Sequence, residues 1–162
     1  FPEDVIVYEV GEIEDENRKV LEGRALPLYR QDYVEDLIKV ISFGKQNVRI
    51  LGYPSISKEI DYENNLAIAQ SRGIVGKAVH ATDNMRWITV EDLNWKEGYI
   101  SGFSGSPVFA LISDVVKVQT IPIGIVSTGN EKSFKFISIN VATNLIEKYL
   151  SSPDHHMVAY GS

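Results

Sequence analysis

The chain has no cysteine and only three histidines among its 162 residues. A disulfide framework and a thiolate zinc site are therefore excluded, and few imidazoles remain for metal chemistry. A cysteine-free composition is typical of proteins in a reducing compartment, which favours the cytoplasm. The sequence implies no cofactor.

Positive charge is also scarce, because 16 Lys and Arg residues stand against 22 Asp and Glu residues, for a formal net charge of -6. This balance argues against a nucleic-acid partner, and no basic cluster is present that would bind an anionic membrane. The acids concentrate between Glu9 and Glu16. The run from Glu12 to Glu16 lacks the alternating oxygen spacing and central glycine of a calcium loop, so we expect a solvated loop there.

Long apolar stretches are absent as well, since no run approaches the roughly 20 residues that a membrane-spanning helix needs. The first residues, Phe1 to Asp4, carry neither the basic segment nor the apolar core of a secretion signal. Because the chain opens without methionine and next to a strand-like segment, we expect it to be a processed product or an excised fragment.

The composition that remains is that of one globular domain, with 44% hydrophobic and 23% charged residues. Runs rich in β-branched and aromatic residues predict strands at residues 4–10, 47–54, 73–80, 86–90, 107–112, 120–127 and 134–139. Residues 32–41 fit either a short helix or an irregular connector, and only residues 141–150 carry a clear helical stripe. We predict an all-β fold, an antiparallel β-barrel with a C-terminal α-helix.

The most informative stretch runs from Gly102 to Pro107 and reads Gly-Phe-Ser-Gly-Ser-Pro, followed by an apolar strand. A serine hydroxyl that attacks a carbonyl needs a turn without bulky neighbours, whose backbone N–H groups point at the developing oxyanion. The pattern therefore indicates a nucleophile at Ser104. The same residue pattern also occurs in ordinary loops, so the surrounding segments must decide between a nucleophile turn and a loop without catalytic function.

In their order, these segments resemble the trypsin-like serine peptidases of the chymotrypsin fold. Residues 4–8 resemble the strand that opens with the catalytic aspartate, residues 48–54 the strand that enters the second barrel, and residues 124–129 the strand bordering the substrate cleft. In that family the aspartate precedes the serine by about 93 residues, and Asp4 and Ser104 have a similar separation. The resemblance implies that residues 1–150 contain the last strand of a first barrel and all of the second, with 151–162 as a polar tail.

The resemblance also implies catalytic roles. Ser104 would be the nucleophile, Asp4 would orient the base, and the N–H groups of Gly102 and Ser104 would form the oxyanion hole. The substrate would be a polypeptide.

Substrate contacts follow from the same resemblance. An extended substrate would pair as an added antiparallel strand with the backbone of Ser127, Thr128 and Gly129. Gly98, six positions before the nucleophile, would lie at the base of the specificity pocket. Because no acid stands at that position, a preference for Arg or Lys is not supported.

The sequence departs from the family in its histidines. A serine hydroxyl needs an imidazole to take its proton, and the family places that base about 45 residues before the aspartate, where this chain has only Phe1 to Glu3. His80 ends a predicted strand and is expected to be a structural or surface histidine, whereas His155 and His156 lie in the tail. We therefore expect the base to come from a missing N-terminal barrel, in the same polypeptide or a separate chain.

Three functions remain open. The leading one is a serine endopeptidase completed by that upstream segment. The second is a catalytically inactive pseudoprotease that acts as a peptide-binding or scaffolding module. The third is an unrelated all-β domain in which the Gly-Ser turn is accidental.

Overall fold

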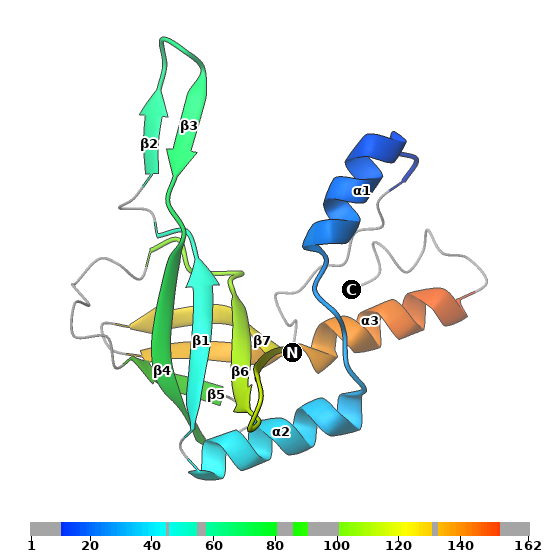
Figure 1. Ribbon diagram of the computed structural model, residues 1–162, viewed down its shortest axis with the longest axis vertical. Coiled ribbons are helices and arrows are strands. Elements are labelled where there is room, and N and C mark those ends of the chain that lie inside the picture. The colour runs from blue at the N-terminus through cyan, green and yellow to red at the C-terminus, as the bar shows by residue number, and fades with distance from the viewer. Residues whose placement is uncertain are drawn as a thin grey trace.

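The computed structural model describes residues 11–44, 46–54, 58–80, 86–90, 101–130 and 133–152. Within these ranges, two helices come first, then eight strands, then a last helix (Figure 1). In chain order the elements are α1 (Asp15–Arg24), α2 (Gln31–Gly44), β1 (Asn47–Gly52), β2 (Lys58–Asp61), β3 (Leu66–Ala69), β4 (Arg72–His80), β5 (Arg86–Val90), β6 (Pro107–Ser113), β7 (Val118–Asn130), β8 (Ser133–Ser138) and α3 (Asn140–Ser151).

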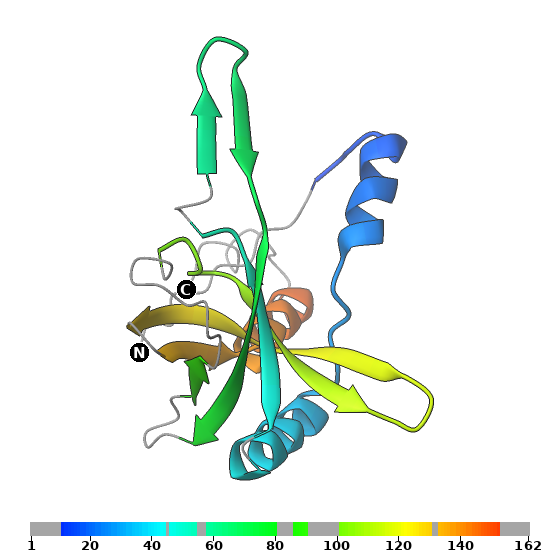
Figure 2. The ribbon, with the colours of Figure 1, turned by 60° about the vertical axis from the view of Figure 1, so that its left-hand side comes forward.

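Six of the strands form one antiparallel sheet in the order β1-β4-β5-β8-β7-β6, and the sheet curls until β6 pairs with β1 and closes a barrel. The remaining two, β2 and β3, form a separate ribbon that projects from the barrel (Figures 1 and 2). The predicted antiparallel barrel with a C-terminal helix is confirmed at this level. That it is the second of two barrels stays a prediction.

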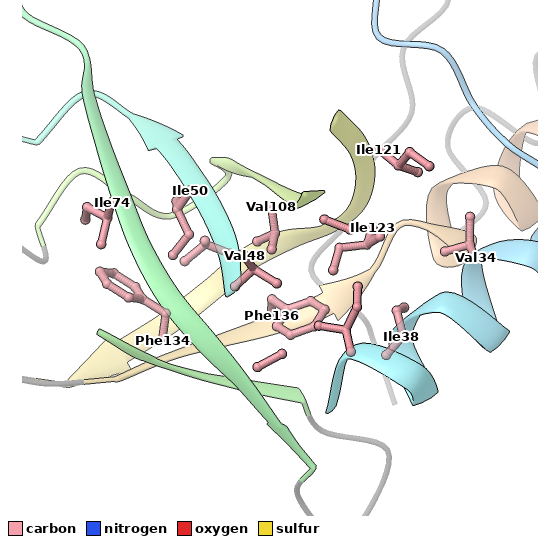
Figure 3. Packing of buried hydrophobic residues seen from close by; sticks show 14 of the residues in the cluster. Val34, Ile38, Val48, Ile50, Ile74, Val108, Ile121, Ile123, Phe134 and Phe136 are labelled. Carbon is pink, nitrogen blue, oxygen red and sulfur yellow. The ribbon is translucent and has the colours of Figure 1, made fainter. Parts of the chain in front are cut away.

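The barrel core comes from strands whose alternate residues are apolar. In β1, exposed and buried residues alternate strictly, with Val48 and Ile50 inside, and in β8 the inward residues are Phe134 and Phe136 (Figure 3). The alternation arises because successive side chains of a strand point to opposite faces of the sheet. Each such side chain contributes about 1.5–3 kcal/mol to folding when fully buried.

Helix α2 closes one end of the barrel. Its residues Val34, Ile38 and Ile41 lie on one helical face, are at most 2% exposed and belong to the same core cluster as the barrel residues (Figure 3). Residues 32–41, for which the sequence left a helix or a connector open, are therefore helical. None of the described helices is long and apolar enough to cross a membrane.

The loop predicted through Glu16 was wrong at its end, because Asp15 and Glu16 form the first turn of α1. Carboxylates at a helix N-terminus are favoured by the partial positive charge of the unpaired N–H groups. Helix α1 has no buried residue. Its sequence therefore needs no apolar stripe and shows none that would have predicted the helix. The expected strand at residues 4–10 lies outside the described residues.

Helix α3 confirms the predicted C-terminal helix. Its apolar stripe is only half-buried, and Leu150 is 66% exposed. Two polar contacts join it to α2: the Asn140 side-chain amide donates to the Gln31 carbonyl at 2.9 Å, and the Gln31 amide donates to Glu147 at 3.0 Å.

Gly124 in β7 is a position where the barrel interior leaves no room for a side chain. A Cβ at this residue would meet the Phe136 ring and would lie 2.7 Å from the carbonyl oxygen of Ile137. We expect Gly124→Ala to lower the free energy of unfolding by about 1–3 kcal/mol, the usual cost of overpacking a core, as measured by urea denaturation. Gly23→Ala in α1, where a Cβ would touch nothing within 4 Å, is the matched control and should cause no loss. Equal stability of the two variants would contradict the packing at Gly124.

Candidate functional site

The Gly102–Ser106 turn leads directly into β6 and contains the serine that the sequence marks as a nucleophile. Two of its residues, Gly102 with φ 94° and Gly105 with φ 83°, have the left-handed backbone that other residues adopt only with strain. The glycines on either side of Ser104 are thus required by the shape of the turn. The sequence argument rested only on their lack of bulk.

Backbone hydrogen bonds fasten this turn to β7. The N–H of Gly105 donates to the carbonyl of Val126 at 2.8 Å, and the N–H of Val126 donates to the carbonyl of Ser106 at 2.9 Å. Inside the turn, the N–H of Ser106 donates to the carbonyl of Phe103 at 2.9 Å. Two bonds therefore hold the turn to β7 and a third closes it internally, which fixes the backbone on both sides of Ser104.

Phe103 and Ser104, although adjacent, occupy opposite environments. Phe103 is fully buried, and its ring packs on Phe134 with centroids 5.6 Å apart and planes inclined by 58°. Ser104 is exposed. The phenyl ring thus anchors the turn in the barrel core while the neighbouring hydroxyl reaches solvent.

The Ser104 hydroxyl donates to the carbonyl oxygen of Ser127 at 3.2 Å. Ser127 is the extra residue of a β-bulge, since Val126 lies opposite Phe136 and Thr128 lies opposite Lys135. A backbone carbonyl accepts a hydrogen bond but is no general base. The hydroxyl is held in place by this bond but is not activated by it.

Two N–H groups of the turn remain available. Within the described residues, neither the Gly102 nor the Ser104 N–H donates to an acceptor, whereas those of Gly105 and Ser106 are both used. An oxyanion hole consists of such preorganised donors beside the nucleophile. These are the same two groups that the family resemblance assigns to that role.

Residues Ser127, Thr128 and Gly129 extend β7 beyond its partner β6. The β6 register with β7 ends where Pro107 lies opposite Ile125, so in the described part of the chain no strand pairs with these residues on the side away from β8. A free strand edge of this kind can accept an extended polypeptide by main-chain hydrogen bonds. This edge begins at Ser127, whose carbonyl oxygen accepts the hydrogen bond from the Ser104 hydroxyl.

Sequence reasoning missed one residue that supports the site. Gly52 ends β1 directly behind the turn, where a Cβ would meet the Ser106 hydroxyl and lie 2.7 Å from the Phe103 ring. The Gly-Tyr-Pro sequence at residues 52–54 suggested only the end of a strand. A glycine at such a place also signals a close backbone approach.

The remaining predicted residues cannot be placed relative to the turn. Asp4, Gly98, His155 and His156 lie outside the described residues, and His80 is placed only through its backbone at the end of β4, opposite Arg86. In the part that the structure describes, Ser104 therefore stands without a base. The same described ranges contain no cluster of three or more His, Cys, Asp or Glu side chains able to hold a metal ion.

The Gly102–Ser106 turn itself contains no ionisable side chain. The carboxyl groups with a clearly lowered pKa belong to other elements. Hydrogen bonds from Arg30 lower the pKa of Asp32 in α2, and the Asn64 side-chain amide lowers that of Asp61 in β2. Neither group takes part in the Ser104 site.

Comparison with known proteins adds no family. No protein-family model matches the chain, and no curated protein matches it.

Proposed function

We propose that this chain is the nucleophile-bearing part of a trypsin-like serine endopeptidase, in which Ser104 attacks the carbonyl carbon of a polypeptide. One observation carries the proposal. Within the described residues, the exposed Ser104 lies on a turn anchored by Phe103, the N–H groups of Gly102 and Ser104 have no acceptor, and residues 127–129 of β7 have no strand partner on the side away from β8.

The proposed chemistry assigns each of these parts a step. The peptide pairs with residues 127–129, its scissile carbonyl oxygen accepts hydrogen bonds from the N–H groups of Gly102 and Ser104, and the hydroxyl oxygen adds to the carbonyl carbon. A base takes the hydroxyl proton and returns it to the leaving amine, and water then hydrolyses the acyl-enzyme. We propose that an imidazole from outside the described residues, oriented by Asp4, supplies this base.

The second candidate is a pseudoprotease that binds peptides at the same strand edge without cleaving them. It is favoured by one observation, the hydrogen bond from the Ser104 hydroxyl to the Ser127 carbonyl, which satisfies the hydroxyl without a base. Peptide pairing with residues 127–129 would persist in such a protein.

A serine-reactive fluorophosphonate separates the two candidates. We expect the full-length protein to be labelled covalently at Ser104, because the reagent requires an activated hydroxyl and an oxyanion hole but no peptide binding. Labelling is followed by intact mass and peptide mapping, and Ser104→Ala should abolish it. Ser101→Ala, which removes an exposed hydroxyl three residues earlier, should leave labelling unchanged. An unlabelled but folded full-length protein would favour the pseudoprotease.

A further inference from the structure

Strands β2 and β3 with the turn between them, residues 58–69, form an arm that projects from the barrel (Figures 1 and 2). Among the described residues, neither strand pairs with the barrel. Isolated two-stranded hairpins are marginally stable, so an arm with a defined shape calls for a structural explanation.

The tip of the arm is fixed by its own side chains. The Asp61 carboxylate accepts the N–H groups of Glu63 at 3.0 Å and Asn64 at 3.2 Å, and the side-chain amide of Asn64 at 2.8 Å. Asn65 completes the turn with φ 52°, a conformation that asparagine tolerates. The amide of Asn64 lowers the pKa of the Asp61 carboxyl, so the tip is both preorganised and negatively charged at neutral pH.

One face of the arm combines carboxylates with aliphatic side chains. Ile68 lies opposite Glu59 and Leu66 lies opposite Asp61, and residues directly opposite each other share a face of the ribbon. Leu66 is 53% and Ile68 is 49% exposed. At the tip, Tyr62 is 83% exposed. Contiguous exposed apolar groups rimmed by charge are typical of binding surfaces.

The arm rises from the same end of the barrel as the Ser104 turn. β3 continues through Gln70 and Ser71 into β4, whose first residue, Arg72, lies opposite Gly52 at the end of β1. Gly52 in turn lies against Phe103 and Ser106. The root of the arm is therefore linked to the nucleophile turn through Gly52, which pairs with Arg72 and lies close to the side chains of Phe103 and Ser106.

We propose that the arm binds the part of an extended polypeptide that continues beyond the residues held at Ser104, and that it selects basic side chains interspersed with apolar ones. The proposal rests on the proposed function, because it needs a polypeptide at the β7 edge. Charge complementarity determines the choice of partner: Glu59, Asp61 and Glu63 are acidic, and a basic peptide also covers Leu66 and Ile68. A four-residue strand spans roughly 13 Å, so a peptide must continue for about four or more residues past the root of the arm to reach the tip.

The test measures binding without turnover, in full-length protein carrying Ser104→Ala. The probes are fluorescein-labelled peptides of about 14 residues in which Lys and Leu alternate, a counterpart with Glu in place of Lys, and a Lys-Leu peptide of about six residues. We expect fluorescence anisotropy to give about tenfold tighter binding for the long basic peptide than for either of the others, a difference of about 1.4 kcal/mol. Adding Leu66→Ser with Ile68→Ser, or Glu59→Lys, should remove that advantage.

The matched control is the tip between β6 and β7, where Val115 is 100% and Val116 is 90% exposed. Val115→Ser with Val116→Ser removes two aliphatic side chains from another hairpin and should not change peptide affinity. Equal affinity of the arm variants and their Ser104→Ala parent for the long basic peptide would overturn the proposal. So would concentration-dependent sedimentation that Leu66→Ser with Ile68→Ser abolishes, because the arm would then bind a second copy of the chain.

The outcomes for the arm and for the peptidase are distinguishable. If the protein with Ser104 intact takes no fluorophosphonate but arm-dependent binding is present, the peptidase fails and the arm assignment stands. If Ser104 is labelled but the arm substitutions leave peptide affinity unchanged, the arm assignment fails and the peptidase proposal stands.

Discussion

Replacing Ser104 by alanine in the full-length protein is expected to lower kcat for peptide hydrolysis by a factor of about 10⁴ to 10⁶, the loss seen when a triad nucleophile is removed. The expected size follows from the proposed role of Ser104, whose turn has two N–H groups without an acceptor among the described residues and whose hydroxyl is bonded to Ser127 in β7. Peptide affinity should be retained, since main-chain pairing with residues 127–129 does not need the hydroxyl. Steady-state kinetics on a fluorogenic peptide measure the first effect, and anisotropy measures the second.

Ser101→Ala is the kinetic control, since Ser101 is exposed and lies outside the Gly102–Ser106 turn. Its kcat should stay within about twofold of that of the unmodified protein, a change in barrier of under 1 kcal/mol. Hydrolysis that survives in Ser104→Ala at the unmodified rate would eliminate Ser104 as the nucleophile, whatever the labelling experiment gives.

Phe103→Ala is expected to lower the free energy of unfolding by about 3–5 kcal/mol, the cost of truncating a fully buried phenylalanine. The ring fills the barrel interior against Phe134, and a Cβ at Gly52 would lie 2.7 Å from it. Because the backbone already lies this close, the surrounding residues cannot move in to fill the cavity that loss of the ring would leave. Urea or thermal denaturation followed by far-UV circular dichroism measures the change. Because the ring also anchors the turn, labelling of Ser104 should slow even where the variant is still folded.

The chain provides a matched aromatic control in Phe43, which is 94% exposed at the end of α2. Phe43→Ala removes the same atoms from solvent instead of from the core, and its stability should stay within about 0.5 kcal/mol of that of the unmodified chain. A similar loss for both variants would mean that Phe103 does not support the turn from the core.

Much of the barrel could be predicted from the sequence because the residue pattern within a single strand indicates which of its side chains are buried. Val48 and Ile50 in β1 alternate with exposed residues, and Phe134 and Phe136 in β8 alternate with half-buried ones. This alternation is a property of the strand alone. Helix α1 was missed because it buries nothing, so its formation depends on helix-favouring residues and leaves no stripe. The arm was missed because its strands have four residues each and their alternation is too short to stand out.

The site could be predicted only in part. The glycines around Ser104 are a local signal, since the backbone of the turn needs them at Gly102 and Gly105. The acceptor of the Ser104 hydroxyl is not local. It depends on the register between β7 and β8, and no residue near Ser127 marks the place where that register shifts.

The bulge at Ser127 has a consequence for the inward face of β7. Up to Val126 the inward residues of β7 keep step with those of β8, but after the extra residue it is Gly129, not Thr128, that lies opposite the buried Phe134. Without the insertion, Thr128 would occupy the interior position and the β7 edge would present a different set of backbone groups. The single added residue thus places Val126 and Gly129, three positions apart, opposite the buried Phe136 and Phe134, so the inward alternation of β7 continues on both sides of the bulge.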